Sequence, residues 1–129
     1  ERITHIAGID ARGFTIGCAL AYALGAGFVM VRKSGKLPPP VQSADYELEY
    51  GRAEVQVPRA LFDGTDTPRV IVVDDMVATG GTMIAGCRLI EDAGGVIVQA
   101  VTVMELKSLS GRERIRKQVQ VELYSLLDY

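Results

Sequence analysis

Residues 70–83 read Val-Ile-Val-Val-Asp-Asp-Met-Val-Ala-Thr-Gly-Gly-Thr-Met. The four β-branched residues at the start predict a short strand buried on both faces, as in a parallel sheet. Two carboxylates, Asp74 and Asp75, follow where that strand should end. The next segment carries apolar residues at helical spacing, namely Ile84, Cys87, Ile90 and Ala93. The stretch therefore predicts a strand, a loop and a helix in succession.

The loop at residues 78–82 has the composition of a phosphate-binding turn. It supplies two threonine hydroxyls, two glycines and backbone N–H groups just before the predicted helix, whose N-terminus favours negative charge. It lacks the Gly-Lys-Ser/Thr of a nucleoside triphosphate loop and the G-x-G-x-x-G of a dinucleotide fingerprint. With two acids beside it, the loop suits a phosphorylated sugar.

The segments on either side repeat this alternation of strand and helix. Strands are predicted at residues 3–9, 28–31, 96–104 and 119–127, and a second helix ends at the glycines near residue 25. The pattern predicts an α/β fold with a doubly wound, mostly parallel sheet and flanking helices. Residues 34–43 read as a loop. Alternation at 46–50 and 53–57, with a turn at Gly51 and Arg52, predicts a projecting antiparallel hairpin arm.

A parallel sheet collects the ends of its strands at one edge, where ligands bind. That edge should gather residues 10–13, 32–33, 74–82 and 105–107, which are far apart in the sequence. Alone, Arg12 reads as an exposed arginine in a tight turn, and the acidic pair as a metal pair, a cap or acceptors for sugar hydroxyls.

Composition narrows the class of protein. The 129 residues, 48% of them hydrophobic, are enough for one domain, residues 1–129. A net charge of −2 gives no general footprint for nucleic acid or an anionic membrane, and no apolar run could span a bilayer. Cys18 and Cys87 lie in apolar helical patterns, which predicts two buried thiols in a reducing, cytoplasmic protein.

Residues 72–82 resemble the phosphoribosyl pyrophosphate signature of the type I phosphoribosyltransferases. Asp-Asp followed by Ala-Thr-Gly-Gly-Thr is most similar to the adenine phosphoribosyltransferases, and the similarity continues through residues 8–14, 32–33, 35–38, 48–51 and 111–113. The resemblance implies the type I fold, a homodimer, and transfer of the phosphoribosyl group to adenine in purine salvage, giving AMP and pyrophosphate. The sequence starts at Glu1, without a methionine, and we therefore expect that the N-terminal segment with which the family covers the base is absent.

The resemblance also implies roles for single residues. Asp74 and Asp75 would hold the ribose hydroxyls, with Mg²⁺ bound mainly by substrate and water rather than by protein ligands. Glu49 would exchange a proton with the base, Tyr50 would close the site, and Leu106 would pack on the base. The 5′-phosphate would lie on the loop, and the pyrophosphate on basic residues: Ala78, Thr79, Gly80, Gly81 and Thr82 for the first, and Arg12, Arg32, Lys33 and Lys36 for the second.

Two of these residues also have a simpler interpretation without a functional role. Glu49 in an alternating strand could face solvent, and Leu106 could be one more core residue. Two other functions also remain open. The same fold could act on guanine, hypoxanthine or xanthine, or it could be a regulator that binds phosphoribosyl pyrophosphate and controls transcription without catalysis, against which the acidic chain argues.

Overall fold

The computed structural model describes residues 2–48 and 51–129. The strands are β1 (His5–Ile9), β2 (Gly27–Lys33), β3 (Val41–Leu48), β4 (Gly51–Pro58), β5 (Arg69–Val77), β6 (Val96–Glu105) and β7 (Leu123–Asp128). The helices are α1 (Arg12–Leu24), α2 (Gly81–Asp92) and α3 (Gly111–Val119), with a 3₁₀ turn, η1 (Lys107–Leu109). Within the described ranges, no helix has the length and apolar character needed to cross a membrane.

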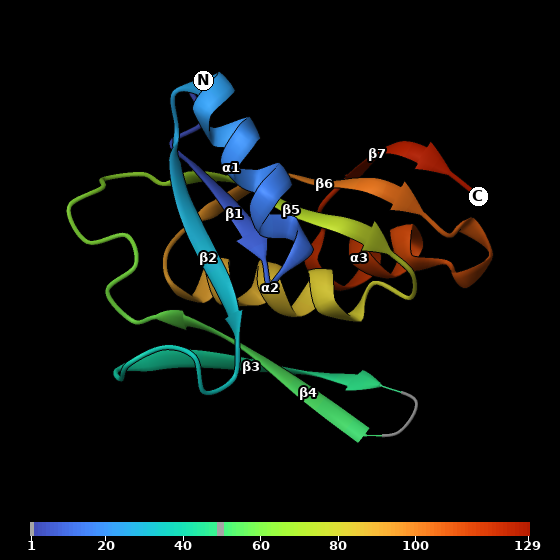
Figure 1. The fold of residues 1–129 in the computed structure, drawn as a ribbon, viewed down its shortest axis with the longest axis horizontal. Helices are drawn as coiled ribbons and strands as arrows, with labels where there is room; N and C mark the ends of the chain where they lie inside the picture. The colour runs from blue at the N-terminus through green and yellow to red at the C-terminus, as the bar shows by residue number, and fades with distance from the viewer. Residues whose placement is uncertain (1, 49–50) are drawn as a thin grey trace.

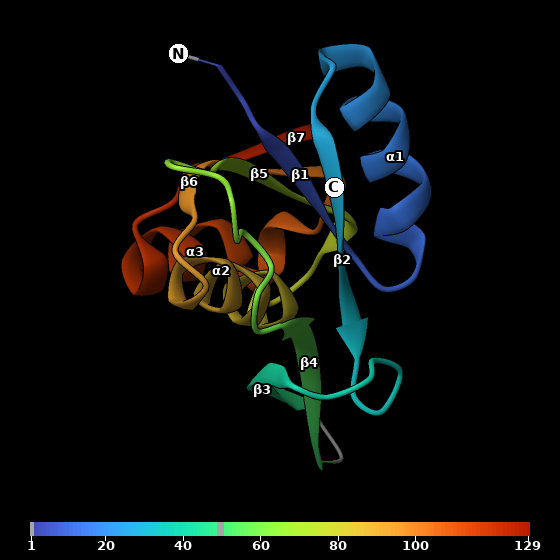
Figure 2. The same ribbon diagram turned by 90° about the vertical axis from the view of Figure 1, so that its left-hand side faces the viewer.

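All seven strands form one sheet in the order β3-β4-β2-β1-β5-β6-β7. β2, β1, β5, β6 and β7 run parallel to one another, whereas β4 is antiparallel to both β2 and β3. Helix α1 covers one face of the parallel part, and α2 and α3 cover the other (Figures 1 and 2). The predicted α/β fold, doubly wound with an antiparallel hairpin arm, is confirmed.

Strand β5, the middle of the five parallel strands, has helices on both of its faces (Figure 2). Val72 packs in the large core cluster with Leu89 and Ile90 of α2, whereas Val73 packs in a second cluster with Ala21 of α1. All five of these side chains are buried, and Val72 and Val73 are both 0% exposed. The run of β-branched residues therefore has the environment that the sequence predicts.

The hairpin arm continues the sheet beyond β2. Arg32 and Lys33 of β2 pair with β4, and β3 pairs with β4 along its whole length, ending with Leu48 opposite Gly51. The arm passes beneath α2 (Figure 1). Two predicted details are wrong. The loop predicted at 34–43 ends before Val41, where β3 begins, and Gly51 and Arg52 lie within β4, because ladder pairing extends to both ends of the arm.

The prediction of two buried thiols is half wrong. Cys87 of α2 is buried, and this burial raises the pKa of its thiol to about 12. Cys18 is exposed. Helix α1 presents Gly13, Gly17 and Ala21 to the sheet, so the neighbouring position 18 faces away from the core.

Candidate active site

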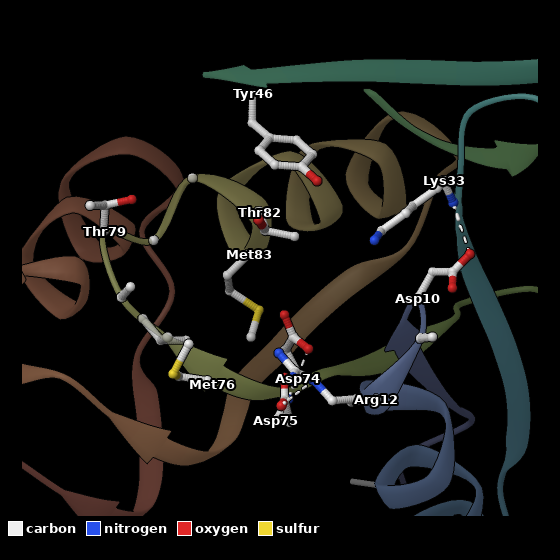
Figure 3. Close-up of a pocket in the computed structure, with 15 residues that line it drawn as sticks. Asp10, Arg12, Lys33, Tyr46, Asp74, Asp75, Met76, Thr79, Thr82 and Met83 are labelled. Carbon is white, nitrogen blue, oxygen red and sulfur yellow. Dashed lines mark hydrogen bonds and ion pairs between the residues drawn. The ribbon is translucent and has the colours of Figure 1, made fainter. Parts of the chain in front are cut away.

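The carboxyl ends of β1 and β5 and the first turns of α1 and α2 enclose a cavity of about 350 Å³ (Figure 3). Four segments of the chain contribute to its walls, and β3 of the hairpin arm closes one side. The lining residues are Asp10, Ala11, Arg12, Lys33, Tyr46 and every residue from Asp74 to Met83. The structure thus brings together the predicted loop, the acidic pair, Arg12 and Lys33.

The loop at residues 78–82 leads into α2 with its backbone donors uncapped. Gly80 occupies the N-cap position at φ +91°, and no side chain of the described residues caps this end of the helix. The first N–H groups of a helix lack partners within the helix and carry its positive dipole end. The turn therefore presents donors suited to a phosphate, as its composition predicts.

Arg12 reaches the acidic pair because α1 begins very close to the end of β5. A Cβ atom on Gly13 would lie 2.7 Å from the carbonyl oxygen of Val73, so only glycine permits this approach. Arg12 Nε then lies 2.7 Å from Asp75 Oδ2, although 77% of the arginine side chain is exposed. An exposed surface pair contributes little stability, so the guanidinium is free to exchange the carboxylate for a ligand's phosphate.

Asp74 carries a perturbed carboxyl group. Burial raises its pKa to about 7, and the neighbouring charge of Asp75 adds to the rise, while the Asp75 N–H and the Arg12 charge oppose it. Asp74 Oδ1 accepts a hydrogen bond from Asp75 N at 2.8 Å. Near neutral pH this carboxyl is therefore divided between its protonated and ionised forms.

This pKa predicts an unusual dependence of stability on pH. From pH 5 to about 7 the folded chain holds a proton on Asp74 that the unfolded chain has released, so folding stability falls as pH rises over this interval and changes little through this group above it. Relative to wild type, Asp74→Asn should gain about 2–3 kcal/mol in the free energy of unfolding over this interval. Urea denaturation at pH 5 and 8 measures it; parallel pH profiles for the two proteins would contradict the assignment.

Asp10, to which the sequence analysis gives no role, organises the basic residues beside the cavity. Its side chain is 2% exposed and faces Arg32 Nε at 3.5 Å and Lys36 Nζ at 3.4 Å. It also accepts from Lys33 N at 3.1 Å. Burial alone would raise the Asp10 pKa, but the Lys33 N–H and the charges of Lys36 and Arg32 lower it overall.

The predicted basic residues consequently separate into two groups. Arg32 and Lys36 face Asp10, while the Lys33 ammonium points into the cavity (Figure 3). Tyr46 of β3 is a further lining residue without a predicted role, and its hydroxyl points toward the cavity. Both omissions have a signal in the sequence: Asp10 ends the first strand at the ligand edge, and Tyr46 lies on the predicted arm.

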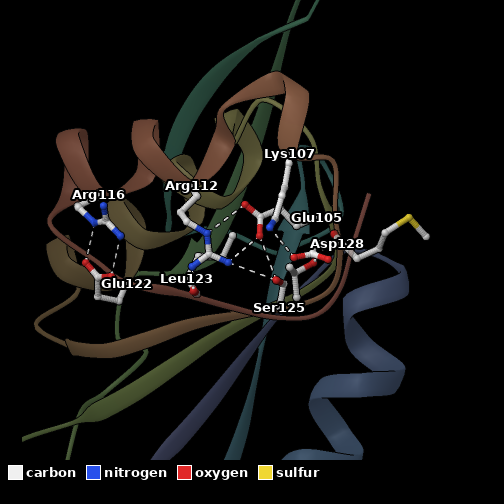
Figure 4. A network of polar contacts seen from close by, with 10 residues as sticks. Glu105, Lys107, Arg112, Arg116, Glu122, Leu123, Ser125 and Asp128 are labelled. Carbon is white, nitrogen blue, oxygen red and sulfur yellow. Dashed lines mark hydrogen bonds and ion pairs between the residues drawn. The ribbon is translucent and has the colours of Figure 1, made fainter.

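The remaining predicted residues lie elsewhere. Leu106 is half-buried and does not line the cavity; its N–H donates to Val77 O at 3.0 Å. Glu49 and Tyr50 lie outside the described residues. Glu105, expected at the ligand edge, is buried against Arg112 instead (Figure 4).

The phosphoribosyl transferase domain family matches residues 1–123. The chain therefore belongs to the phosphoribosyltransferase family, as the signature predicts. Within that family it is similar to the adenine phosphoribosyltransferases. The Mus musculus protein of that name is 48% identical over 129 residues, which are 99% of this chain and 68% of the mouse protein.

Solved structures give the same result. Adenine phosphoribosyltransferase from Rhodothermus marinus superposes with a TM-score of 0.90 at 40% identity, over 100% of this chain and 71% of that one. The Saccharomyces cerevisiae enzyme, complexed with an imino-altritol bisphosphate and adenine, gives 0.87 at 38%, over 98% and 69%. The Trypanosoma brucei enzyme, in complex with AMP, pyrophosphate and ribose-5-phosphate, gives 0.86 at 32%, over 99% and 57%.

Proposed function

We propose that this chain transfers the phosphoribosyl group of phosphoribosyl pyrophosphate to adenine, giving AMP and pyrophosphate. The observation that carries the proposal is the arrangement of charge in one cavity. Uncapped N–H donors of the loop line one end, Arg12 and Lys33 line another, and Asp74 and Asp75 lie between them. A sugar with a phosphate at one end and a pyrophosphate at the other has the complementary pattern. The similar T. brucei enzyme was solved with the corresponding products.

The reaction replaces one bond at the anomeric carbon by another. A ring nitrogen of adenine attacks as the bond to the pyrophosphate oxygen breaks, and the nitrogen loses its proton. Residues 79–82 hold the 5′-phosphate, and Asp74 and Asp75 accept from the ribose hydroxyls. Arg12 and Lys33 neutralise the departing pyrophosphate, with Arg32 and Lys36 adding positive charge from their positions on Asp10. Positioning and preorganised charge thus supply most of the rate.

Mg²⁺ fits this donor set as a substrate-borne ion. Among residues 2–48 and 51–129 no group of three or more His, Cys, Asp or Glu side chains is placed to hold a metal ion, whereas Asp74 and Asp75 line the cavity. Mg²⁺ commonly keeps its waters and takes one or two carboxylates together with substrate phosphates. Substrate oxygens and waters would supply most of its ligands, with Asp74 and Asp75 supplying at most one or two, and the ion would neutralise charge on the pyrophosphate.

From the family resemblance, Glu49 is our candidate for the proton acceptor, with Tyr50 closing the site and Leu106 contacting the base. Glu49→Gln should lower kcat about 100-fold, at the lower end of general acid–base catalysis, because the amide cannot take the proton. Glu47→Gln removes a neighbouring exposed carboxylate of β3 and is the matched control. Steady-state AMP formation across pH measures both; equal loss in the two variants would exclude the role of Glu49.

The base is identified by competition. Purified protein is given phosphoribosyl pyrophosphate, Mg²⁺ and adenine, guanine, hypoxanthine or xanthine, and the nucleotide product is measured. We expect AMP to dominate and Asp75→Asn to lower its formation. Binding of phosphoribosyl pyrophosphate without turnover of any base would refute the enzymatic function.

The family resemblance supports three broader proposals. Residues 1–129 form one catalytic core domain, the enzyme is a homodimer, and it works in the cytoplasm. Sedimentation equilibrium measures the second of these directly, and a monomer at assay concentration with full activity would contradict it.

A further inference from the structure

Helix α3 packs against the loop at residues 78–82, which we call the phosphate loop. Arg114 Nη1 donates a hydrogen bond to the carbonyl oxygen of Thr79 at 2.7 Å. The start of the helix lies even closer. A Cβ on Gly80 would lie 3.0 Å from Gly111 O, and a Cβ on Gly111 would lie 2.5 Å from Ala78 O. Two stretches of bare backbone are therefore packed together, with one arginine tying them.

Arg114 does not line the candidate active site. It lines a second cavity, formed by β3, α2 and α3, which shares Thr79, Gly81 and Tyr46 with the first but not Arg114. The Thr79 carbonyl is thus directed to a cation outside the active site. This matters because a carbonyl oxygen turned toward a phosphate would repel it.

The hydrogen bond from Arg114 to the Thr79 carbonyl also fixes the direction of the Gly80 N–H. The Thr79–Gly80 peptide is trans, so its C=O and N–H point in opposite directions. Gly80, at φ +91°, belongs to the residue type with the fewest restrictions on backbone rotation. Without Arg114 the Thr79 carbonyl would lose this hydrogen bond, and a turn of the peptide plane would exchange the Gly80 N–H for the Thr79 carbonyl.

We propose that Arg114 is a positioning residue for the 5′-phosphate: it acts through the Thr79 peptide and does not touch the substrate. The inference rests on the proposed function, because it assumes that residues 79–82 hold a sugar phosphate. It predicts a defect confined to the phosphate end of the site. Binding of pyrophosphate, which lies on Arg12 and Lys33, should be independent of Arg114.

The test uses Arg114→Gln, with ribose 5-phosphate and pyrophosphate as separate probes in isothermal titration calorimetry. Loss of a charge-assisted hydrogen bond that fixes the loop should weaken ribose 5-phosphate about tenfold, leave pyrophosphate unchanged, and raise KM for phosphoribosyl pyrophosphate more than it lowers kcat. Arg114→Lys, which keeps a donor, should recover part of the affinity. Arg116→Gln is the control, since it removes an exposed arginine of the same helix that pairs with Glu122 instead of the loop.

The outcomes separate the two claims. Wild-type protein that binds neither probe would refute the proposed function. If Arg114→Gln binds ribose 5-phosphate as tightly as wild type does, the positioning role is overturned. Equal weakening of ribose 5-phosphate binding in Arg116→Gln would also overturn it, because the loss would then come from the helix as a whole. Should Arg114→Gln fail to fold, the comparison of Arg114→Lys with wild type decides, since unaltered affinity for both probes and unaltered KM overturn the role.

Discussion

Replacing Gly80 with alanine should lower kcat/KM for phosphoribosyl pyrophosphate about 10³-fold, since displaced phosphate donors cost both binding and alignment. Gly80 adopts φ +91°, a conformation that L side chains rarely adopt, and an added Cβ would lie 3.0 Å from Gly111 O and 3.3 Å from Ile115 Cγ1. Neither neighbour yields readily, because one is backbone and the other belongs to a fully buried residue. The loop itself must move, and with it the N–H groups of the α2 N-terminus.

The matched control is Gly64→Ala. Gly64 has φ +86°, close to that of Gly80, but nothing lies within 4 Å of an added Cβ. Gly64→Ala therefore introduces the same backbone strain as Gly80→Ala but no steric clash. Gly64 lies between β4 and β5 and does not line the cavity. Steady-state kinetics and ribose 5-phosphate titrations should show full activity for Gly64→Ala. Comparable activity in Gly80→Ala would mean that the loop does not grip the phosphate.

Replacing Arg112 with alanine should lower the free energy of unfolding by about 3 kcal/mol, the scale for a buried carboxylate that loses its partner. Arg112 Nε and Nη2 lie 3.1 Å and 2.6 Å from the two oxygens of Glu105. Glu105 is 3% exposed, and Ser125 Oγ also donates to it at 3.0 Å (Figure 4). Arg112 further donates to Leu123 O. One side chain thus joins α3 to both β6 and β7.

Two variants determine whether this loss of unfolding free energy comes from the Glu105 carboxylate that Arg112→Ala leaves without a partner. Arg116→Ala removes a salt bridge with Glu122 in which both side chains are largely exposed, and should leave the urea midpoint nearly unchanged. Adding Glu105→Ala to Arg112→Ala removes the unpaired carboxylate, so the double variant should be more stable than the sum of the single changes predicts. An additive result would mean that lost packing, and not charge, explains the effect.

The sequence allows most of the fold and the centre of the site to be predicted. The β-branched run before Asp74 requires burial on both faces, and alternation of strand and helix then leaves few topologies. The donor-rich turn at residues 78–82 also follows from residue types, because two glycines, two threonines and a helix start lie within five residues. Local chemistry of this kind needs no partner from elsewhere in the chain.

Only the tertiary structure decided which charges meet. Asp10, Arg32 and Lys36 form one group because β1 and β2 are neighbours in the sheet, and the acidic Asp10 draws two predicted pyrophosphate ligands toward itself. Glu105 turns from the ligand edge to Arg112, and Arg114 reaches Thr79 across 35 residues of sequence. These contacts depend on distances between elements rather than on the pattern within any one. The sequence by itself determined most of the elements and the donor-rich loop at residues 78–82. Packing determined the electrostatic partners, because Coulomb and hydrogen-bond energies act over a few ångströms that sequence spacing does not encode.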